Sequence, residues 1–362
     1  MDKNIKVAVI GCGRISGHHC DSIIDVDGIE MIAVCDLDIA KANTYRDKFG
    51  IKAFNNFHEM LTKIPEIDVV IIATPSGMHY EHALDIIENY KKNVIIEKPT
   101  FMKPSQVNEV YLKAEEVGVN VFAVFQNRHN KAVSRVLSGI ANDELGELRT
   151  LAVRVRWCRP QAYYDLAPWR GTFSMDGGSL TNQGIHHIDL MRKLGGEVER
   201  VISSLRTLGA EIEVEDTATA AIEFKNGAVG SLEITTAARP DNYEASISLV
   251  CEKGLAQIGG IAVNELQIYT PQPEACKEFS EDFSGNVYGK GHVKIYQEIS
   301  DFFHKDMQFP VSKEDTLATI QLLNSFYISD EEGQWINVSD AGDSMRLGKE
   351  DNQLADLYRH YK

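Results

Sequence analysis

The sequence contains no apolar run long enough to span a membrane, and it shows neither an internal repeat nor a low-complexity segment. Its first residues lead straight into a strand without a signal-peptide pattern. The six cysteines are scattered, without the spacing of a disulfide framework or a metal site, and this favours a reducing compartment. From these absences we expect a cytoplasmic protein.

Positive charge is also scarce. Lys and Arg number 37 against 53 Asp and Glu, which gives a formal net charge of −16. Proteins that bind nucleic acids or anionic membranes need a basic surface, so neither kind of partner is predicted. An anionic substrate would have to be held by local Arg, Lys and backbone N–H groups against the overall field.

The chain of 362 residues, 43% hydrophobic and 25% charged, has the composition of a globular protein with two domains. Its first part alternates short β-branched runs, turns and helical segments, which predicts a Rossmann-type doubly wound parallel sheet over residues 1–126. The predicted strands are Lys6–Ile10, Met31–Cys35, Asp68–Ala73, Asn93–Ile96 and Asn120–Val124.

The first strand runs into a glycine turn and then a helix, an arrangement that seats a pyrophosphate on helix N–H groups. Gly11 would allow the tight turn and Gly13 the close backbone approach, with Arg14 and Ile15 following. Asp36 ends the second strand, where a carboxylate can accept from both ribose hydroxyls of an adenosine. Because it would also repel a 2′-phosphate, NAD is favoured over NADP.

Polar residues follow the next three strands at the edge where open α/β sheets bind ligands. Lysines lie more often on the surface, but the motifs around Lys98 favour a role at this edge. The residues delivered there are Thr74, Pro75, Ser76, His79, Glu97, Lys98 and Gln126.

After residue 148 the period changes to alternating apolar and polar residues with hairpin turns. This predicts a C-terminal α+β domain, residues 127–338, built on an open, mostly antiparallel sheet whose polar face suits solvent or a wet subunit interface. Residues 339–362 are a polar tail with a short helix at Gln353–Tyr361. The other predicted strands and helices are Leu151–Trp157, Thr217–Phe224, Val229–Thr235, Ser246–Val250, Leu255–Ile258, Leu266–Tyr269, Gly291–His304 and Ser312–Ile328.

Chemistry-bearing side chains are densest in residues 157–189, which include a loop rich in aromatic and cationic residues at 159–172. A helix is predicted from Gly178, on which Asn182, His186 and Asp189 share one face. The competing interpretation is a core histidine, more so for His187 than for His186. Because adjacent histidines do not complete one tetrahedral site, no metal is predicted.

Three motifs in this order, Gly11–Arg14, Glu97–Pro99 and Gly184–Asp189, resemble the glucose–fructose oxidoreductase/inositol dehydrogenase (Gfo/Idh/MocA) family over residues 4–330. That family usually carries an acid one turn before the histidine, where this chain has Asn182. Further stretches resemble a narrower group that shares this asparagine, the bacterial UDP-N-acetyl-2-amino-2-deoxyglucuronate dehydrogenases of surface-polysaccharide pathways. These stretches are Trp157–Asp165, Trp169–Thr172, Asp176–Gly178, Asn182–Gln183, Val214–Thr217, Gly259–Glu265 and Tyr288–His292.

The resemblance implies NAD-dependent oxidation of the sugar 3′-hydroxyl to a ketone. A hydride leaves only as the hydroxyl proton leaves, so a base must lie within hydrogen-bond reach of that oxygen. We propose His186 as the base and Lys98 as the group that holds the hydroxyl and stabilises the developing negative charge. The roles can also be exchanged, with Lys98, near the cationic nicotinamide ring, as the base.

The resemblance also implies a homodimer or homotetramer and, in some similar enzymes, a bound cofactor that 2-oxoglutarate reoxidises. Arg159 and Arg170 are candidates for the uronate carboxylate or the diphosphate, because an Arg fork binds either one in bidentate fashion. The predicted cofactor contacts are Gly11, Gly13, Arg14, Ile15, Asp36, Thr74, Pro75, Ser76, His79, Glu97, Lys98, Gln126, Trp169 and Arg170. The predicted substrate contacts are Lys98, Arg159, Tyr163, Tyr164, Asn182, Gln183, His186 and His292.

Two other functions stay open from the sequence. One is a dehydrogenase of a free polyol or sugar such as an inositol, which differs in that UDP alone would neither bind nor compete. The other is a non-catalytic NAD-binding regulator on the same fold. If the protein were such a regulator, we would expect Lys98 or His186 to be replaced, and both residues are present.

Overall fold

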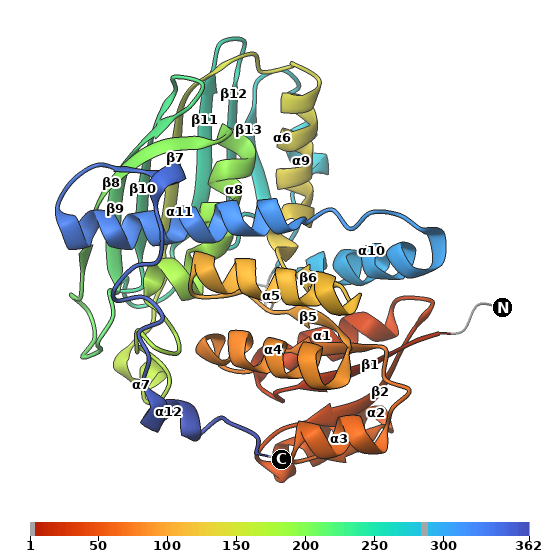
Figure 1. Cartoon of the computed structure of the whole chain (residues 1–362). Helices are drawn as coiled ribbons and strands as arrows, with labels where there is room; N and C mark the ends of the chain where they lie inside the picture. Colours follow the sequence, from red (N-terminus) through yellow and green to blue (C-terminus); the bar gives the residue numbers. More distant parts are fainter. Residues whose placement is uncertain (1–3, 284–288, 362) are drawn as a thin grey trace. The chain divides into compact units, whose positions relative to one another are not determined.

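The computed structural model describes residues 4–283 and 289–361. The chain divides into unit 1, residues 1–124, 292–317 and 350–362, and unit 2, residues 125–291 and 318–349. Figure 1 labels the helices and strands. Among the helices in the described ranges, none is both long and apolar enough to cross a membrane. Tyr288, which belongs to one of the stretches named above, lies outside the described residues.

Unit 1 contains a six-stranded sheet in the order β3-β2-β1-β4-β5-β6, in which every neighbouring pair is parallel. The predicted Rossmann sheet is confirmed. The strand order reverses between β1 and β4, and open α/β sheets bind ligands at such a reversal. The strands are β1 (Ile5–Ile10), β2 (Ile29–Cys35), β3 (Lys52–Phe54), β4 (Val69–Ile72), β5 (Asn93–Ile96) and β6 (Val121–Ala123).

The core of unit 1 is completed by a helix from late in the chain. Ile295, Tyr296 and Ile299 of α10 are buried in the same cluster as Val7 and Val9 of β1. The sequence places an apolar residue or an aromatic ring at helical spacing on this face, which explains why it packs. The helices are α1 (Arg14–Ile24), α2 (Ile39–Phe49), α3 (Phe57–Lys63), α4 (His79–Tyr90), α5 (Pro104–Val117), α10 (Gly291–Lys305) and α12 (Asn352–Asp356).

The last residues of the chain pack on unit 1. The helix α12 ends at Asp356, whereas the sequence analysis predicts a helix through Tyr361. The backbone leaves the helix because the carbonyl oxygens of His360 and Tyr361 accept hydrogen bonds from His58 Nε2 (2.8 Å) and Asn56 Nδ2 (2.7 Å). The polar tail is therefore docked by specific contacts.

We expect this docked segment to loosen in acid. The rings of His82 and His360 are 5.8 Å apart. Burial, with the charge of a neighbouring histidine, lowers their pKa values to about 3 and about 4. Both rings are neutral when the segment is docked. Their contribution to the stability of the docked segment is therefore complete above the ordinary histidine pKa of about 6.5 and is lost as the pH falls toward 4. Intrinsic-rate-corrected hydrogen exchange of residues 350–361 should be at least about 10-fold faster at pH 5 than at pH 7.5.

The variant His360→Gln removes one of the two titrating rings and should lose the part of this pH difference that His360 contributes. Equal protection of residues 350–361 at both pH values in the unaltered protein would contradict the prediction.

Unit 2 contains an eight-stranded sheet in the order β13-β12-β11-β7-β10-β9-β8-β14. Among the described strands of this sheet, only β7 and β10 pair in parallel. The predicted mostly antiparallel sheet is therefore confirmed. The strands are β7 (Leu148–Arg156), β8 (Val198–Arg206), β9 (Thr217–Phe224), β10 (Val229–Thr235), β11 (Glu244–Cys251), β12 (Leu255–Gly259), β13 (Glu265–Tyr269) and β14 (Ile336–Asn337).

One long strand, β8, is absent from the sequence prediction. Its register shifts between Val198 and Arg200, where the pairing with β9 skips one residue. This irregularity puts the buried residues at Val198, Val201 and Leu205, a spacing that looks helical. An extra residue in a strand hides the two-residue period on which strand prediction depends.

The two faces of this sheet differ in chemistry. Leu151, Val153 and Val155 of β7 are buried, and α8 packs beside this strand. On the other face Arg156 makes a two-point ion pair with Glu233, at 2.6 and 3.0 Å. The helices of unit 2 are α6 (Lys131–Ala141), α7 (Gln161–Tyr164), α8 (Ile185–Gly195), α9 (Ala275–Glu278) and, from residue 318, α11 (Lys313–Glu332).

Candidate active site

The turn after β1 requires glycine at position 11, both for its backbone conformation and for its close packing against Ala73. Gly11 has φ of +89°, and a Cβ there would lie 2.5 Å from the carbonyl oxygen of Ala73, so the turn requires glycine. Gly13 is exposed, and a Cβ there would meet nothing within 4 Å. It caps α1 without any side-chain hydrogen bond, so no cap side chain occupies the first-turn N–H groups at Arg14 and Ile15. This geometry fits a pyrophosphate.

Asp36 lies beside this turn. Its Oδ2 accepts a hydrogen bond from the N–H of Cys12 (2.7 Å), and its Oδ1 accepts one from the N–H of Asp38 (2.9 Å). A carboxylate fixed here beside the turn suits two ribose hydroxyls. The following residues, Leu37 and Asp38, bring no cation for a 2′-phosphate. The residues present therefore fit NAD.

The turns after β4 and β5 are joined by His79. This buried ring lies between two carbonyl oxygens, with Nε2 3.0 Å from Thr74 O and Nδ1 2.9 Å from Pro99 O. Burial lowers the pKa of His79, outweighing these contacts. Pro75 and Ser76 lie in the same β4 turn. His79 thus fixes the two turns that carry most of the predicted edge residues.

Glu97 lies in the interior of unit 1, only 3% exposed, with His292 at 1%. Glu97 Oε1 is 3.2 Å from His19 Nε2 and 3.4 Å from His292 Nε2. Its Oε2 accepts a hydrogen bond from the N–H of Lys98, at 2.9 Å. Burial alone would raise the pKa of Glu97, but the hydrogen bonds of the two histidines, the largest of the opposing effects, hold it well below its usual range. Glu97 is therefore an anion.

The sequence analysis does not single out His19. A usable signal exists, because the buried positions of α1 include Ser16, His19 and Ile23, so a histidine falls within an otherwise small or apolar stripe. A buried polar side chain of this kind needs a partner, which the sequence cannot name.

In unit 2, His186 lies on α8 and is buried, with its Nε2 3.1 Å from the Nε2 of Gln126. The structure thus brings these two predicted site residues together. Asp189, one turn along, is held by Arg128 Nε (2.7 Å) and Thr319 Oγ1 (3.0 Å). These buried bonds fix the rotation of α8 and hence the position of His186.

The helix predicted from Gly178 is corrected by the structure. Ser179–Gln183 forms a π-helical turn, and α8 begins only at Ile185. A Cβ at Gly178 would lie 2.1 Å from the carboxyl group of Glu215, and one at Gly184 would lie 2.6 Å from Ile234. This close packing forces the wider turn, so Asn182 does not share a regular α-helical face with His186.

Three neighbouring residues have partners within the unit. Asn182 Nδ2 donates to Asp176 Oδ1, and Asn182 Oδ1 accepts from Gln183 Nε2 at 3.2 Å. His187 is fully buried with its ring edge-on to Trp157. Burial lowers the pKa of His187 to about 4. His187 is a core histidine.

Two arginines flank the ring of Tyr163. The guanidinium carbon of Arg159 is 5.3 Å from the ring centroid and that of Arg170 is 4.4 Å. Arg170 Nη1 donates a hydrogen bond to the Tyr163 hydroxyl at 2.6 Å. The guanidinium carbon of Arg170 also lies 4.5 Å from the centroid of the Trp169 ring. Within the described residues neither arginine pairs with a carboxylate. Arg159 Nη1 donates instead to Cys158 O (2.7 Å) and Asn242 Oδ1 (3.1 Å), and the buried Nε–H of Arg170 has no acceptor. Tyr164, by contrast, is buried against Thr236.

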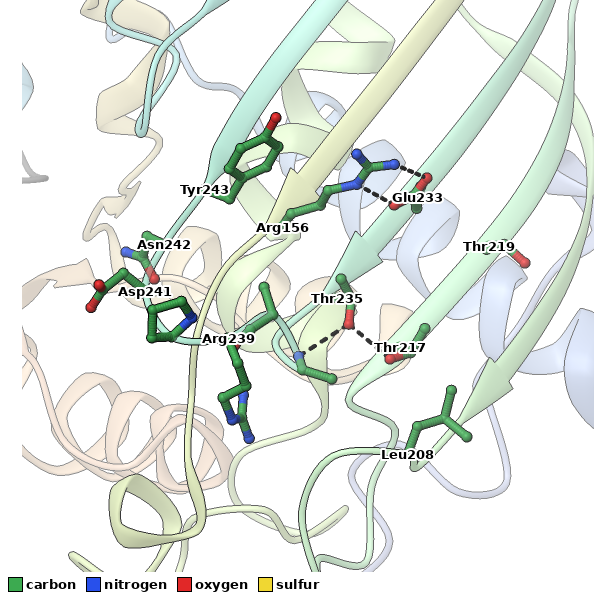
Figure 2. Close-up of a pocket in the computed structure, with 13 residues that line it drawn as sticks. Arg156, Leu208, Thr217, Thr219, Glu233, Thr235, Arg239, Asp241, Asn242 and Tyr243 are labelled. Carbon is green, nitrogen blue, oxygen red and sulfur yellow. Dashed lines mark hydrogen bonds and ion pairs between the residues drawn. The ribbon is translucent and has the colours of Figure 1, made fainter.

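A separate cavity of about 640 Å³ lies on the polar face of the unit 2 sheet, lined by β7, β9, β10 and the loop that follows β10 (Figure 2). Figure 2 shows Arg156 and Glu233 paired along one side and Thr217 and Thr235 hydrogen-bonded beside them. None of the predicted site residues lines this cavity.

Comparison with known proteins agrees with this geometry. Residues 5–125 match the Gfo/Idh/MocA oxidoreductase family, described as having an NAD-binding Rossmann fold, and residues 133–257 match the GFO/IDH/MocA C-terminal domain. Crystal structures of the WlbA dehydrogenases from Bordetella pertussis and Chromobacterium violaceum, each with NADH and UDP-GlcNAcA, are 32% identical to this chain. Their TM-scores are 0.87 and 0.86, and they cover 93% of this chain and 98% and 96% of their own.

More distant relatives act on other sugars. The myo-inositol 2-dehydrogenase of Thermotoga maritima is 25% identical over 69% of this chain and 74% of its own length. The D-glucoside 3-dehydrogenase of Escherichia coli is 28% identical over 64% of this chain and 70% of its own. With both domains matched and the dinucleotide turn in place, the chain belongs to the Gfo/Idh/MocA family of NAD-dependent oxidoreductases.

Proposed function

We propose that this enzyme oxidises the 3′-hydroxyl of a UDP-linked N-acetylglucosaminuronic acid to a ketone, in the synthesis of a surface polysaccharide such as lipopolysaccharide. The observation that carries the proposal is the pair of arginines around Tyr163. Two guanidiniums without a carboxylate partner in the described residues suit a substrate with its own carboxylate and diphosphate. A neutral polyol would leave both cations unpaired. Similarity to the two WlbA dehydrogenases supports the same substrate.

The proposed chemistry uses Lys98 and His186. When bound, NAD+ supplies the hydride acceptor. His186 takes the hydroxyl proton. Lys98 holds the same oxygen and stabilises its developing charge. The exchanged assignment, with Lys98 as the base, is separated by the pH profiles described in the Discussion.

The direct test is a spectrophotometric assay. Purified protein with UDP-GlcNAcA and NAD+ should produce absorbance at the reduced-nicotinamide wavelength. No turnover over a broad panel of sugar nucleotides would contradict the proposal. Oxidation of free myo-inositol, with no competition by UDP, would favour the second candidate, a polyol dehydrogenase, which the similarity to inositol dehydrogenases supports.

The arginine pair gives a sharper prediction. Arg170→Met should raise the KM for the UDP-sugar acid by about 10- to 100-fold, because a desolvated charge loses its partner, with a smaller effect on the KM for NAD+. Arg149→Met is the matched control, since Arg149 is exposed and pairs with Glu147 at 3.0 Å. An unchanged substrate KM in Arg170→Met would remove this arginine from the proposed site.

Cofactor turnover and assembly complete the proposal. NAD stays bound between cycles and is reoxidised by 2-oxoglutarate, which predicts NAD(H) in the denatured protein and consumption of 2-oxoglutarate by the loaded enzyme. Protein free of nucleotide after purification would contradict this. The enzyme is a cytoplasmic homodimer or homotetramer, for which the polar face of the unit 2 sheet is suited. Light scattering measures that state.

A further inference from the structure

The buried cluster around Glu97 has no part in the proposed chemistry so far. We propose that Glu97 is a positioning residue for Lys98: its carboxylate, fixed by His19 and His292, holds the lysine backbone so that the side chain meets the substrate hydroxyl. This inference rests on the proposed function, in which Lys98 touches that oxygen.

The first step of the argument is geometric. The carboxylate of Glu97 uses one oxygen for the two histidines and the other for the N–H of Lys98. The histidines come from α1 and α10, so the carboxylate is held from two separate helices. With Glu97 immobile, the amide of the next residue is immobile as well, and the direction in which Lys98 leaves the strand is fixed.

The second step concerns protons. The Tyr296 hydroxyl is 2.6 Å from His19 Nδ1. A neutral His19 protonated on Nε2 accepts from Tyr296 and donates to Glu97, and His292 donates from its own Nε2. Burial lowers the pKa of His292, which keeps that ring neutral. One assignment of protons therefore satisfies every contact to the carboxylate.

The third step is energetic. A fully buried carboxylate between histidines is costly, and an apolar residue of similar volume would often give equal or greater stability. A closed polar network fixes one geometry more firmly than apolar packing does. It reaches the active-site edge through the N–H of Lys98. The titratable groups that face Glu97 are His18 and His19 of α1, His79 of α4, His292 and Tyr296 of α10, and Lys98 itself.

A metal ion held by His19, Glu97 and His292 is the alternative explanation for this buried cluster. The ligand atoms of His19, Glu97 and His292 lie within 4.8 Å of one another. All three atoms already take part in hydrogen bonds of 3.2 and 3.4 Å. Although His292 Nδ1 is buried without a partner in the described residues, every contact to the carboxylate is satisfied without an ion, so we assign positioning rather than metal binding. One equivalent of metal per chain in the purified protein, removed by a chelator together with the effects below, would overturn this assignment.

The first measurement does not depend on activity. In Glu97→Gln an amide N–H must face one of the donors, so the acceptor for the Lys98 amide or for the histidines is lost. Hydrogen exchange at the Lys98 amide, followed in a peptide that spans residues 97–102, should be at least about 10-fold faster than in the unaltered protein. Unchanged exchange overturns the inference whatever the substrate is.

The second measurement is kinetic. Glu97→Gln should lower kcat by about 100-fold through misplacement of the lysine, with both KM values within about 3-fold of the unaltered enzyme. His292→Gln keeps a donor and should retain most of kcat, whereas His292→Leu should lose at least about 10-fold. Equal kcat in the two His292 variants, per folded molecule, overturns the positioning role.

The matched control is His58→Leu, another buried histidine of unit 1, bonded to Tyr90. It should leave kcat unchanged. The two proposals fail separately: an unaltered enzyme that leaves UDP-GlcNAcA unoxidised overturns the proposed function, whereas the exchange result decides the role of Glu97.

Discussion

Replacing Lys98 with methionine is expected to lower kcat by at least about 1,000-fold while NAD still binds. Methionine keeps a similar length but has no charge, so neither proton transfer nor charge stabilisation at the substrate oxygen survives. The turn that carries Lys98 is held by Glu97 and His79, so its backbone should keep its place. Initial rates with the UDP-sugar acid and a fluorescence titration with NADH measure the two effects.

Lys113→Met is the control for this variant, because Lys113 lies on α5 of the same unit and pairs with Glu116. Turnover within about 3-fold of normal in Lys98→Met would refute the role. The comparison with His186→Asn assigns the base. The variant that lacks the base should lose the acid limb of the kcat/KM profile, and its residual rate should rise with hydroxide concentration.

Glu215→Gln is expected to stabilise the protein at alkaline pH and to leave it unchanged in acid. Glu215 is buried under the π-helical turn, where its Oε1 accepts from the Leu180 N–H (3.0 Å) and from the Tyr327 hydroxyl (2.9 Å). Its Oε2 is buried without a partner in the described residues. Burial, only partly offset by these hydrogen bonds, raises the pKa of Glu215 to about 7.

The direction in which stability changes with pH follows from how tightly Glu215 binds its proton in the folded and unfolded states. The folded protein holds this proton more tightly than the unfolded chain, whose glutamate has an ordinary pKa of about 4.5. Stability is therefore complete below pH 4.5 and falls as the pH rises through 7, by about 3 kcal/mol for this separation. Glutamine has no proton to lose, so Glu215→Gln should gain up to about 3 kcal/mol at pH 8 and nothing at pH 4.5.

Urea unfolding at the two pH values measures this difference. Glu211→Gln, in the same loop but exposed, should show no such pH-dependent gain. A Glu215→Gln variant that is less stable than the unaltered protein at pH 8 would contradict a raised pKa.

The regular parts of the fold were accessible from local pattern. β5 has the predicted bounds, Asn93–Ile96, because β-branched residues fill a strand that is buried on both faces. β8 was not accessible, because its register shift replaces the strand period with a helical one. The start of α8 at Ile185 was likewise hidden, because the close packing of Gly178 on Glu215 is a tertiary contact.

The candidate site divides in the same way. Topology alone places residues at the carboxyl edge of a parallel sheet, so the turn residues and Asp36 could be chosen from sequence. Pairing could not. Glu97 and His292 are 195 positions apart, and nothing local in the sequence indicates that they share a hydrogen bond. The hydrogen bond between Tyr164 and Thr236, 72 positions apart, was not accessible for the same reason.

The origin of α10 has a consequence for biosynthesis. Ile295, Tyr296 and Ile299 are part of the unit 1 core, yet the ribosome makes them only after all of residues 125–291. At about 5–20 residues per second, the nascent first domain waits roughly 9–35 s for α10. Until then the apolar surface that these three residues cover is exposed on the nascent domain, and such transiently exposed surface is prone to aggregation.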